Sequence, residues 1–146
     1  MSEIKQKAQA LNEYLVATRR HFHENPESSL KEYDTAAYIQ KELTSFGIPF
    51  EKVAETGTLA IIKGGKGEGK TVLLRADIDA LELPDCTSKP YASKRPGLNH
   101  ACGHDAHTTM GLGTARVLNE LKDSFAGTVL IAFQPAEEIG AGAKQF

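Results

Sequence analysis

Two short apolar runs on either side of a stretch with helical periodicity constrain the fold of this chain more than any other feature. The first run, TVLLRADI, covers residues 71–78, and the second, TVLIAF, covers residues 128–133. Between them, over residues 106–122, apolar residues recur at helical spacing. A strand, a helix and a strand in this order form a right-handed crossover with parallel strands. The sequence therefore predicts an α/β fold with a central sheet, on which Gly111 and Gly113 let the crossover helix pack closely.

The remaining segments predict further helices and strands around this unit. Apolar residues at helical spacing predict amphipathic helices over residues 4–21 and 31–46. Short apolar runs predict strands over residues 49–53 and 58–63.

The connections between these elements differ in character. GGKGEGK, residues 64–70, is typical of a hairpin-type connection, so strands 58–63 and 71–78 are predicted to be neighbours. The polar, aperiodic stretch 84–98 predicts a surface loop. The last residues, GAGAKQF, look like the opening turn of another helix.

Composition excludes several classes of protein. Of the 146 residues, 17 are Lys or Arg and 19 are Asp or Glu, so no basic surplus exists that would favour a nucleic acid partner. The N-terminal segment lacks a signal-peptide pattern, and no stretch approaches the roughly 18 apolar residues of a membrane span. Cys86 and Cys102 lie in different surroundings and make a poor disulfide framework. We therefore expect a single domain in a cytoplasmic protein that binds neither nucleic acid nor membrane.

Polar side chains cluster where the predicted strands end. Asp77 and Asp79 close the first strand of the crossover, and Glu137 and Glu138 follow the second. The segment 100–105 enters the crossover helix from the same side. Because ligands gather at the carboxyl ends of parallel strands, these clusters are predicted to converge at one edge of the sheet.

The segment HACGHDAH holds five potential metal ligands within eight residues, namely His100, Cys102, His104, Asp105 and His107. In an extended loop, Cys102 and His104 would point to the same side and could hold one metal ion. The alternative is that Cys102 is a small buried hydrophobe and that the histidines pack against or cap the helix. Five clustered donors at a strand end favour the metal site.

The acidic pairs admit a functional and a structural interpretation. Adjacent side chains such as Glu137 and Glu138 point in different directions, so one can bind a metal while the other serves as general base. A solvated acidic helix start is the alternative. Strand alternation places Arg75, Asp77 and Asp79 on one face, where they form an internal ion pair or support a metal-bound histidine.

Four segments, taken in order, resemble the aminoacylase, hippurate hydrolase and auxin-conjugate (IAA-amino acid) amidohydrolase group of co-catalytic metallopeptidases. These are RRHFHENPE (19–27), RADIDALELP (75–84), NHACGHDAH (99–107) and FQPAEE (133–138). The resemblance implies that Cys102, His104 and Glu138 are metal ligands, that Glu137 is the general base and that Asp77 is the supporting acid. It also implies two divalent ions (zinc, manganese, cobalt or nickel) and a three-layer sandwich with a mostly parallel sheet.

Members of this group are more than twice as long as this chain. The comparison implies that residues 1–146 are the N-terminal part of the catalytic domain, so that the fold is incomplete at its C-terminal side. The dimerisation domain and two further histidine ligands would lie beyond it. Cys102, His104 and Glu138 alone provide the three ligands of a site with one open position, too few for two metals. We also expect the exposed sheet edge and apolar surface to drive self-association.

The implied activity is hydrolysis of the amide bond of an N-acyl amino acid or a dipeptide-like small molecule by a homo-oligomer, with little or no activity in these 146 residues alone. Two rivals remain open. One is a thiol hydrolase with Cys102 as nucleophile. The other is a truncated, non-catalytic product that binds a metal or a partner.

Overall fold

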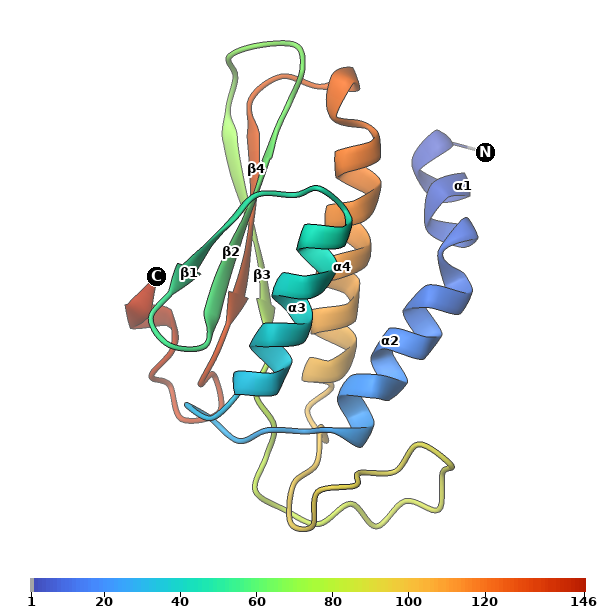
Figure 1. Ribbon diagram of the computed structural model, residues 1–146, viewed down its shortest axis with the longest axis vertical. Coiled ribbons are helices and arrows are strands. Elements are labelled where there is room, and N and C mark those ends of the chain that lie inside the picture. The colour runs from blue at the N-terminus through green and yellow to red at the C-terminus, as the bar shows by residue number, and fades with distance from the viewer. Residues whose placement is uncertain (1) are drawn as a thin grey trace.

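The computed structural model describes residues 2–146 as one four-stranded sheet with helices packed on one face (Figure 1). Along the chain, the elements are α1 (Glu3–Ala10), α2 (Asn12–Glu24), α3 (Tyr33–Ser45), β1 (Phe50–Val53), β2 (Gly57–Lys63), β3 (Thr71–Asp77), α4 (His104–Glu120), η1 (Lys122–Ser124), β4 (Thr128–Gln134) and η2 (Ala143–Gln145). The predicted α/β class is confirmed. The C-terminal segment forms only the short 3-10 turn η2.

The strands are ordered β1-β2-β4-β3. β3 and β4 are parallel, as the crossover predicts, whereas β2 pairs antiparallel with both β1 and β4. The sheet of the described residues is therefore mixed, with its parallel pairing confined to β3 and β4. The prediction that β2 and β3 are neighbours was wrong, because β4 lies between them. The glycine-rich connection crosses the start of β4, where the Gly64 N–H donates to the Gly127 carbonyl at 2.8 Å.

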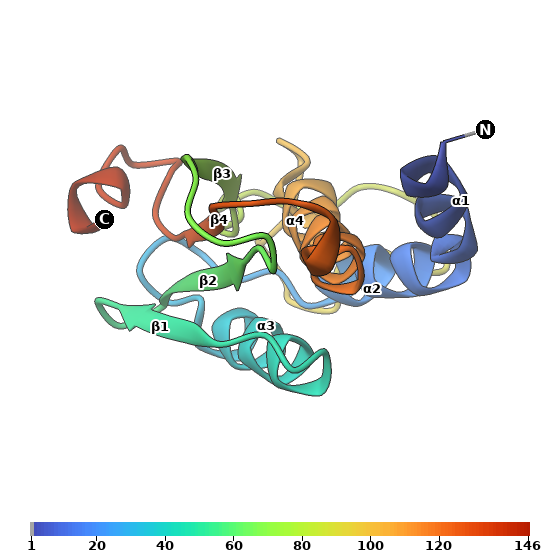
Figure 2. The ribbon, with the colours of Figure 1, turned by 90° about the horizontal axis from the view of Figure 1, so that it is seen from above.

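The core lies between the sheet and the helices α3 and α4. Figure 2 shows α2, α3 and α4 on the same side of the sheet. The strands contribute alternate residues to this core and the helices contribute their apolar stripes, including Ala60, Ile62, Ala76, Ile131, Phe133, Ile39, Leu43 and Leu112. Among residues 2–146, no long helix lies on the opposite face, so the described residues show the sheet and one helical layer of the expected three-layer sandwich.

The first predicted helix is two helices in the structure. It breaks at the buried Leu11, whose φ and ψ are −87° and 2°. The break turns the apolar residues of α1 toward α4, and a groove of about 290 Å³ between the two helices is lined by Ile4, Ala8 and Leu11 together with residues of α4.

Three further features of the structure bear on the sequence expectations. Among residues 2–146, no helix has both the length and the apolar character that a membrane crossing requires. Cys86 and Cys102 are both free, exposed thiols. The segment 84–98 is an irregular loop, joined to the rest by a bridge between Leu81 and Asn99.

Candidate metal centre

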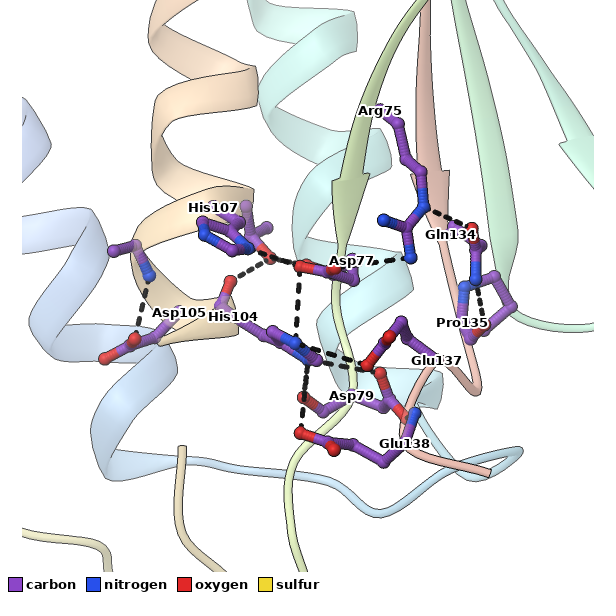
Figure 3. A network of polar contacts seen from close by, with 12 residues as sticks. Arg75, Asp77, Asp79, His104, Asp105, His107, Gln134, Pro135, Glu137 and Glu138 are labelled. Atoms are coloured by element: carbon purple, nitrogen blue, oxygen red, sulfur yellow. Dashed lines mark hydrogen bonds and ion pairs between the residues drawn. The ribbon is translucent and has the colours of Figure 1, made fainter. Parts of the chain in front are cut away.

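The predicted convergence of polar side chains is present at one edge of the sheet (Figure 3). Asp77 ends β3, His104 begins α4, and Glu137 and Glu138 follow β4. Two overlapping groups offer ligand atoms within 4.8 Å of one another, Asp77 with His104 and His107, and His104 with Glu137 and Glu138. His104 is common to both groups, so it occupies the centre of the candidate site.

The ring of His104 is oriented by a backbone carbonyl. Its Nδ1 lies 2.9 Å from the carbonyl oxygen of Asp79, so the hydrogen of the neutral ring is on Nδ1. Its Nε2 then faces the carboxylates, 3.5 Å from Asp77 Oδ1 and 3.6 Å from Glu137 Oε2. A backbone or carboxylate acceptor on the far nitrogen is the usual support of a metal-bound histidine.

The charges around His104 favour a cation. Burial alone would lower the pKa of His104, but the Asp79 side chain and the charge of Asp77 outweigh it and raise the pKa to about 9. Burial would likewise raise the pKa of Asp79, but hydrogen bonds from His104, Ser29 and the Glu138 backbone lower it to about 2. The carboxylates of Asp77 and Asp79 therefore make the surroundings of His104 negative, and such surroundings favour a positive charge, either a proton on the ring or a bound cation.

The turn after β4 separates the two glutamates. Glu138 is the more buried, with 15% of its side chain exposed against 39% for Glu137. Oε1 of Glu138 is buried and has no hydrogen-bond partner within residues 2–146. It lies 3.7 Å from His104 Nδ1, beyond hydrogen-bonding distance. An unpaired buried carboxylate oxygen is costly without a cation, so this atom fits a metal ligand.

Asp77 has two further partners. One of its oxygens lies 2.5 Å from His107 Nδ1, and the other lies 3.4 Å from an Arg75 nitrogen. The ion pair weighed for Arg75 is thus formed, and Nε of Arg75 also donates to Gln134 Oε1 at 2.5 Å. Asp79 does not join this pair. It lies beyond the end of β3 and accepts a hydrogen bond from the Ser29 hydroxyl at 2.6 Å.

Cys102 is placed differently from the expectation. Gly103 takes a left-handed φ of 85°, and His104 is already helical, so the segment is not an extended loop with both side chains on one side. Cys102 lies outside both groups of ligand atoms within residues 2–146. The Glu138 side chain is the main cause that raises the pKa of the Cys102 thiol, which indicates that the two side chains are near each other.

The other members of HACGHDAH have distinct surroundings. Asp105 is fully buried, forms an ion pair with Arg19 Nε at 2.8 Å, and accepts a hydrogen bond from His23 Nδ1 at 2.7 Å. His100 is buried with no hydrogen-bond partner within residues 2–146, and burial lowers its pKa to about 4. Sequence reasoning from single residues missed Arg19 and His23, although their i, i+4 spacing places them on one helix face.

The donors at this edge suit a divalent metal ion. One imidazole and two or three carboxylates, with one buried oxygen left unpaired, match the nitrogen and oxygen ligands that zinc and manganese accept in proteins. The side chain of Glu137 is partly exposed, so its carboxylate is accessible from solvent.

Known proteins with similar sequences share this site region. The sequence model of peptidase family M20/M25/M40 matches residues 73–146. The N-acetyl-L-cysteine deacetylase of Bacillus subtilis is 49% identical over 134 residues, which cover 91% of this chain and 32% of that protein. The N-acyl-L-amino acid amidohydrolase of Geobacillus stearothermophilus is 40% identical over 141 residues, 96% of this chain and 38% of that protein.

A solved structure shows the same fold. It is a Bacillus subtilis protein described as a dinuclear metal binding peptidase from the M20 family, with a TM-score of 0.90 and 44% identity over 94% of this chain and 39% of that one. The chain spans about a third of the length of the curated relatives that it matches. On the family match and this level of identity, the chain belongs to peptidase family M20/M25/M40.

Proposed function

We propose that this chain provides part of the active site of a metal-dependent amidohydrolase that cleaves N-acyl amino acids. The observation that carries the proposal is the cluster of His104, Glu137 and Glu138, which offer ligand atoms within 4.8 Å of one another. One buried oxygen of Glu138 in this cluster has no hydrogen-bond partner within residues 2–146. The names of the relatives from Bacillus subtilis and Geobacillus stearothermophilus support small N-acylated amino acids as the substrate class.

The proposed metal ligands are His104, Glu138 and Cys102. A divalent ion held by these residues would polarise the amide carbonyl and make the attacking water easier to deprotonate. The unpaired oxygen of Glu138 and the oriented ring of His104 support their roles, and Cys102 is supported by its position beside Glu138.

Glu137 is the proposed general base. Its carboxylate takes the proton of the attacking water as the new carbon–oxygen bond forms, and it gives that proton to the amine as the carbon–nitrogen bond breaks. The greater exposure of Glu137 than of Glu138 supports this division, since the base must reach the substrate.

Asp77 is the proposed supporting acid. Its carboxylate contacts both His107 and Arg75 and lies 3.5 Å from His104 Nε2. Asp77 therefore holds a negative charge in a fixed position beside the proposed ligand His104.

The whole protein is proposed to bind two metal ions of zinc, manganese, cobalt or nickel and to act as a homo-oligomer. Residues 2–146 form two overlapping groups of ligands that share His104, and a solved relative is described as dinuclear. We propose that these residues correspond to the N-terminal part of the catalytic domain, with further metal ligands on other parts of the longer protein.

The test is release of acetate from N-acetyl-L-amino acids by the longer protein proposed above, treated with a chelator and then supplied with Mn²⁺ or Zn²⁺. We expect activity to depend on the added metal and to fall by about 10²- to 10⁴-fold in Glu137→Gln. Glu120→Gln is the matched control, because Glu120 pairs with Lys7 on the outer face of α4. Metal binding without acetate release would instead favour a non-catalytic metal-binding role.

The thiol hydrolase is the second candidate, because Cys102 is a free, exposed thiol. The side chain of Glu138 raises the pKa of Cys102, and both a nucleophilic and a metal-binding cysteine require the thiolate, so chemical tests must separate the two roles. Activity that survives exhaustive chelation but is lost on thiol alkylation would favour the thiol mechanism over the metal one.

A further inference from the structure

Glu32, just before α3, is fully buried and contacts the turn that carries Glu137. Its Oε1 accepts a hydrogen bond from the backbone N–H of Ala136 at 2.8 Å and another from the N–H of Leu30 at 3.0 Å. Its Oε2 accepts one from the hydroxyl of Thr56 at 2.8 Å. The carboxylate therefore ties the start of α3 to a segment about 100 residues later in the chain.

The residue held by Glu32 has an unusual backbone conformation. Ala136 has a φ of 51°, in the left-handed region that a residue with a Cβ adopts only at an energetic cost. Its carbonyl accepts hydrogen bonds from the N–H groups of Ala141 and Gly142, each at 3.1 Å. Because Ala136 immediately precedes Glu137, its dihedral angles decide the direction in which Glu137 leaves the backbone.

A second buried carboxylate holds the other end of this turn. The N–H of Glu138 donates to Asp79 Oδ2 at 3.0 Å. The backbone from Ala136 to Glu138 is thus held by Glu32 at one end and by Asp79 at the other. The side chain of Glu137 projects toward His104 (Figure 3).

We infer that Glu32 is a positioning residue for the metal centre, which holds Ala136 in its left-handed conformation and thereby aims Glu137 and Glu138 at His104. The inference rests on the proposed function for its consequence in metal binding. The claim about the turn itself rests only on the contacts of Glu32.

Two substitutions of Glu32 distinguish the effect of its side-chain volume from the effect of its hydrogen-bond acceptor atoms. Glu32→Leu introduces an apolar side chain of similar volume and leaves the Ala136 N–H without an acceptor. Glu32→Gln keeps a carbonyl oxygen for Ala136, and its amide can donate to the hydroxyl of Thr56, which can accept as well as donate. Glu32→Gln is therefore the conservative variant that should restore the function lost in Glu32→Leu.

Glu27 offers a matched control. It is 4% exposed and accepts hydrogen bonds from the backbone N–H groups of Asp34 and Thr35 at 3.2 and 2.7 Å. These groups start α3 and are not part of the turn after β4. Glu27→Leu should therefore reduce stability without changing metal binding by the folded protein.

The experiment is calorimetric titration of Zn²⁺ into the chelator-treated chain, at a temperature where circular dichroism shows each variant folded. We expect Glu32→Leu to weaken Zn²⁺ binding by about tenfold or more, as loss of a residue that orients ligands does. Glu32→Gln and Glu27→Leu should bind as the unmodified chain does. Adding Ala136→Gly to Glu32→Leu should recover affinity, because glycine adopts a positive φ freely. Equal losses in Glu32→Leu and Glu27→Leu, or no loss in Glu32→Leu, would overturn the inference.

Amide hydrogen exchange of Ala136, followed by NMR, tests the positioning role without any metal. Exchange should be faster in Glu32→Leu and unchanged in Glu27→Leu. If the unmodified chain binds no Zn²⁺, the proposed function fails, and the exchange rate still decides whether Glu32 holds the turn. An unchanged rate in Glu32→Leu refutes that role.

Discussion

Gly111 of α4 lies against Phe133 of β4 so closely that a Cβ at residue 111 would come within 2.8 Å of the phenyl ring. The same atom would lie 3.2 Å from the Cβ of Ala76 on β3. This contact sets the distance between α4 and the two parallel strands. It therefore also sets how near His104 and His107, on the first turns of α4, come to Asp77.

Gly111→Ala should destabilise the protein despite the higher helix propensity of alanine. Overpacking typically costs about 1–3 kcal/mol, which exceeds the gain of up to about 1 kcal/mol from replacing a helical glycine. Gly113→Ala is the matched control, since its added Cβ would meet the flexible end of Leu15 on α2 at 2.7 Å. Urea unfolding should show the larger loss for Gly111→Ala. Equal effects would mean that α4 can move away from the sheet freely.

That difference also refines the expectation for the two glycines. Both were predicted to mark close packing on the sheet, and this is confirmed for Gly111 alone. Gly113 contacts the neighbouring helix instead, because two residues along an α-helix change the facing direction by about 200°.

The loop over residues 84–98 is held by the side chain of Asp85. Backbone N–H groups of Ser93 and Thr87 each donate to its carboxylate at 2.8 Å, and these bonds lower the pKa of Asp85 to about 2. Because the folded pKa is lower than the unfolded one of about 3.9, the ionised carboxylate contributes its stabilisation fully above that pH. The contribution is lost as the pH falls through about 2.

Carbon-detected NMR titration of Asp85 should show the side chain still ionised at pH 3. The protection factor of the Ser93 amide, the ratio of its intrinsic exchange rate to its observed rate at the same pH, should fall only at lower pH, whereas Asp85→Asn should reduce it at neutral pH as well. A midpoint for Asp85 near the ordinary value of about 3.9 would show that the loop is not held in this way.

β3 is an edge strand with an apolar surface. Val72, Leu73 and Leu74 are 51%, 57% and 39% exposed, and no strand of residues 2–146 pairs with the outer side of β3. An unpaired apolar edge favours association, so this chain should self-associate at high concentration. Sedimentation should show a shift toward monomer in Leu73→Lys and none in Ile4→Lys, whose residue is 58% exposed on α1. A monodisperse monomer in the unmodified chain would contradict this expectation.

Local sequence patterns predicted the parts of the site whose position follows from chain order. A strand, a helix and a strand place Asp77, His104 and Glu137 at one edge of the sheet whatever the rest of the chain does. For the same reason, the bounds of α4 and β4 are within about two residues of the predicted ones.

The features that escaped prediction depend on distant contacts or on single dihedral angles. β4 lies between β2 and β3, and this order depends on contacts between strands that are distant in the sequence. The connection GGKGEGK is long enough either to form a hairpin between adjacent strands or to cross over a strand that lies between them. The relation of Cys102 to His104 depends on the left-handed φ of Gly103. In the sequence, Glu32 has the pattern of an ordinary charged residue before a helix. Only its hydrogen bond with the Ala136 N–H, seen in the folded chain, indicates its role.

The central claim is that His104, Glu138 and Cys102 bind one metal ion, and Co²⁺ tests it most directly because thiolate ligation gives cobalt a near-ultraviolet charge-transfer absorption. Titration of the chelator-treated chain with Co²⁺ should produce this band. Cys102→Ser should bind Co²⁺ without the band, His104→Ala and Glu138→Gln should bind it far more weakly, and Cys86→Ser should behave as the unmodified chain. A spectrum that lacks the band, or Co²⁺ binding that is the same in all these variants, would contradict the account.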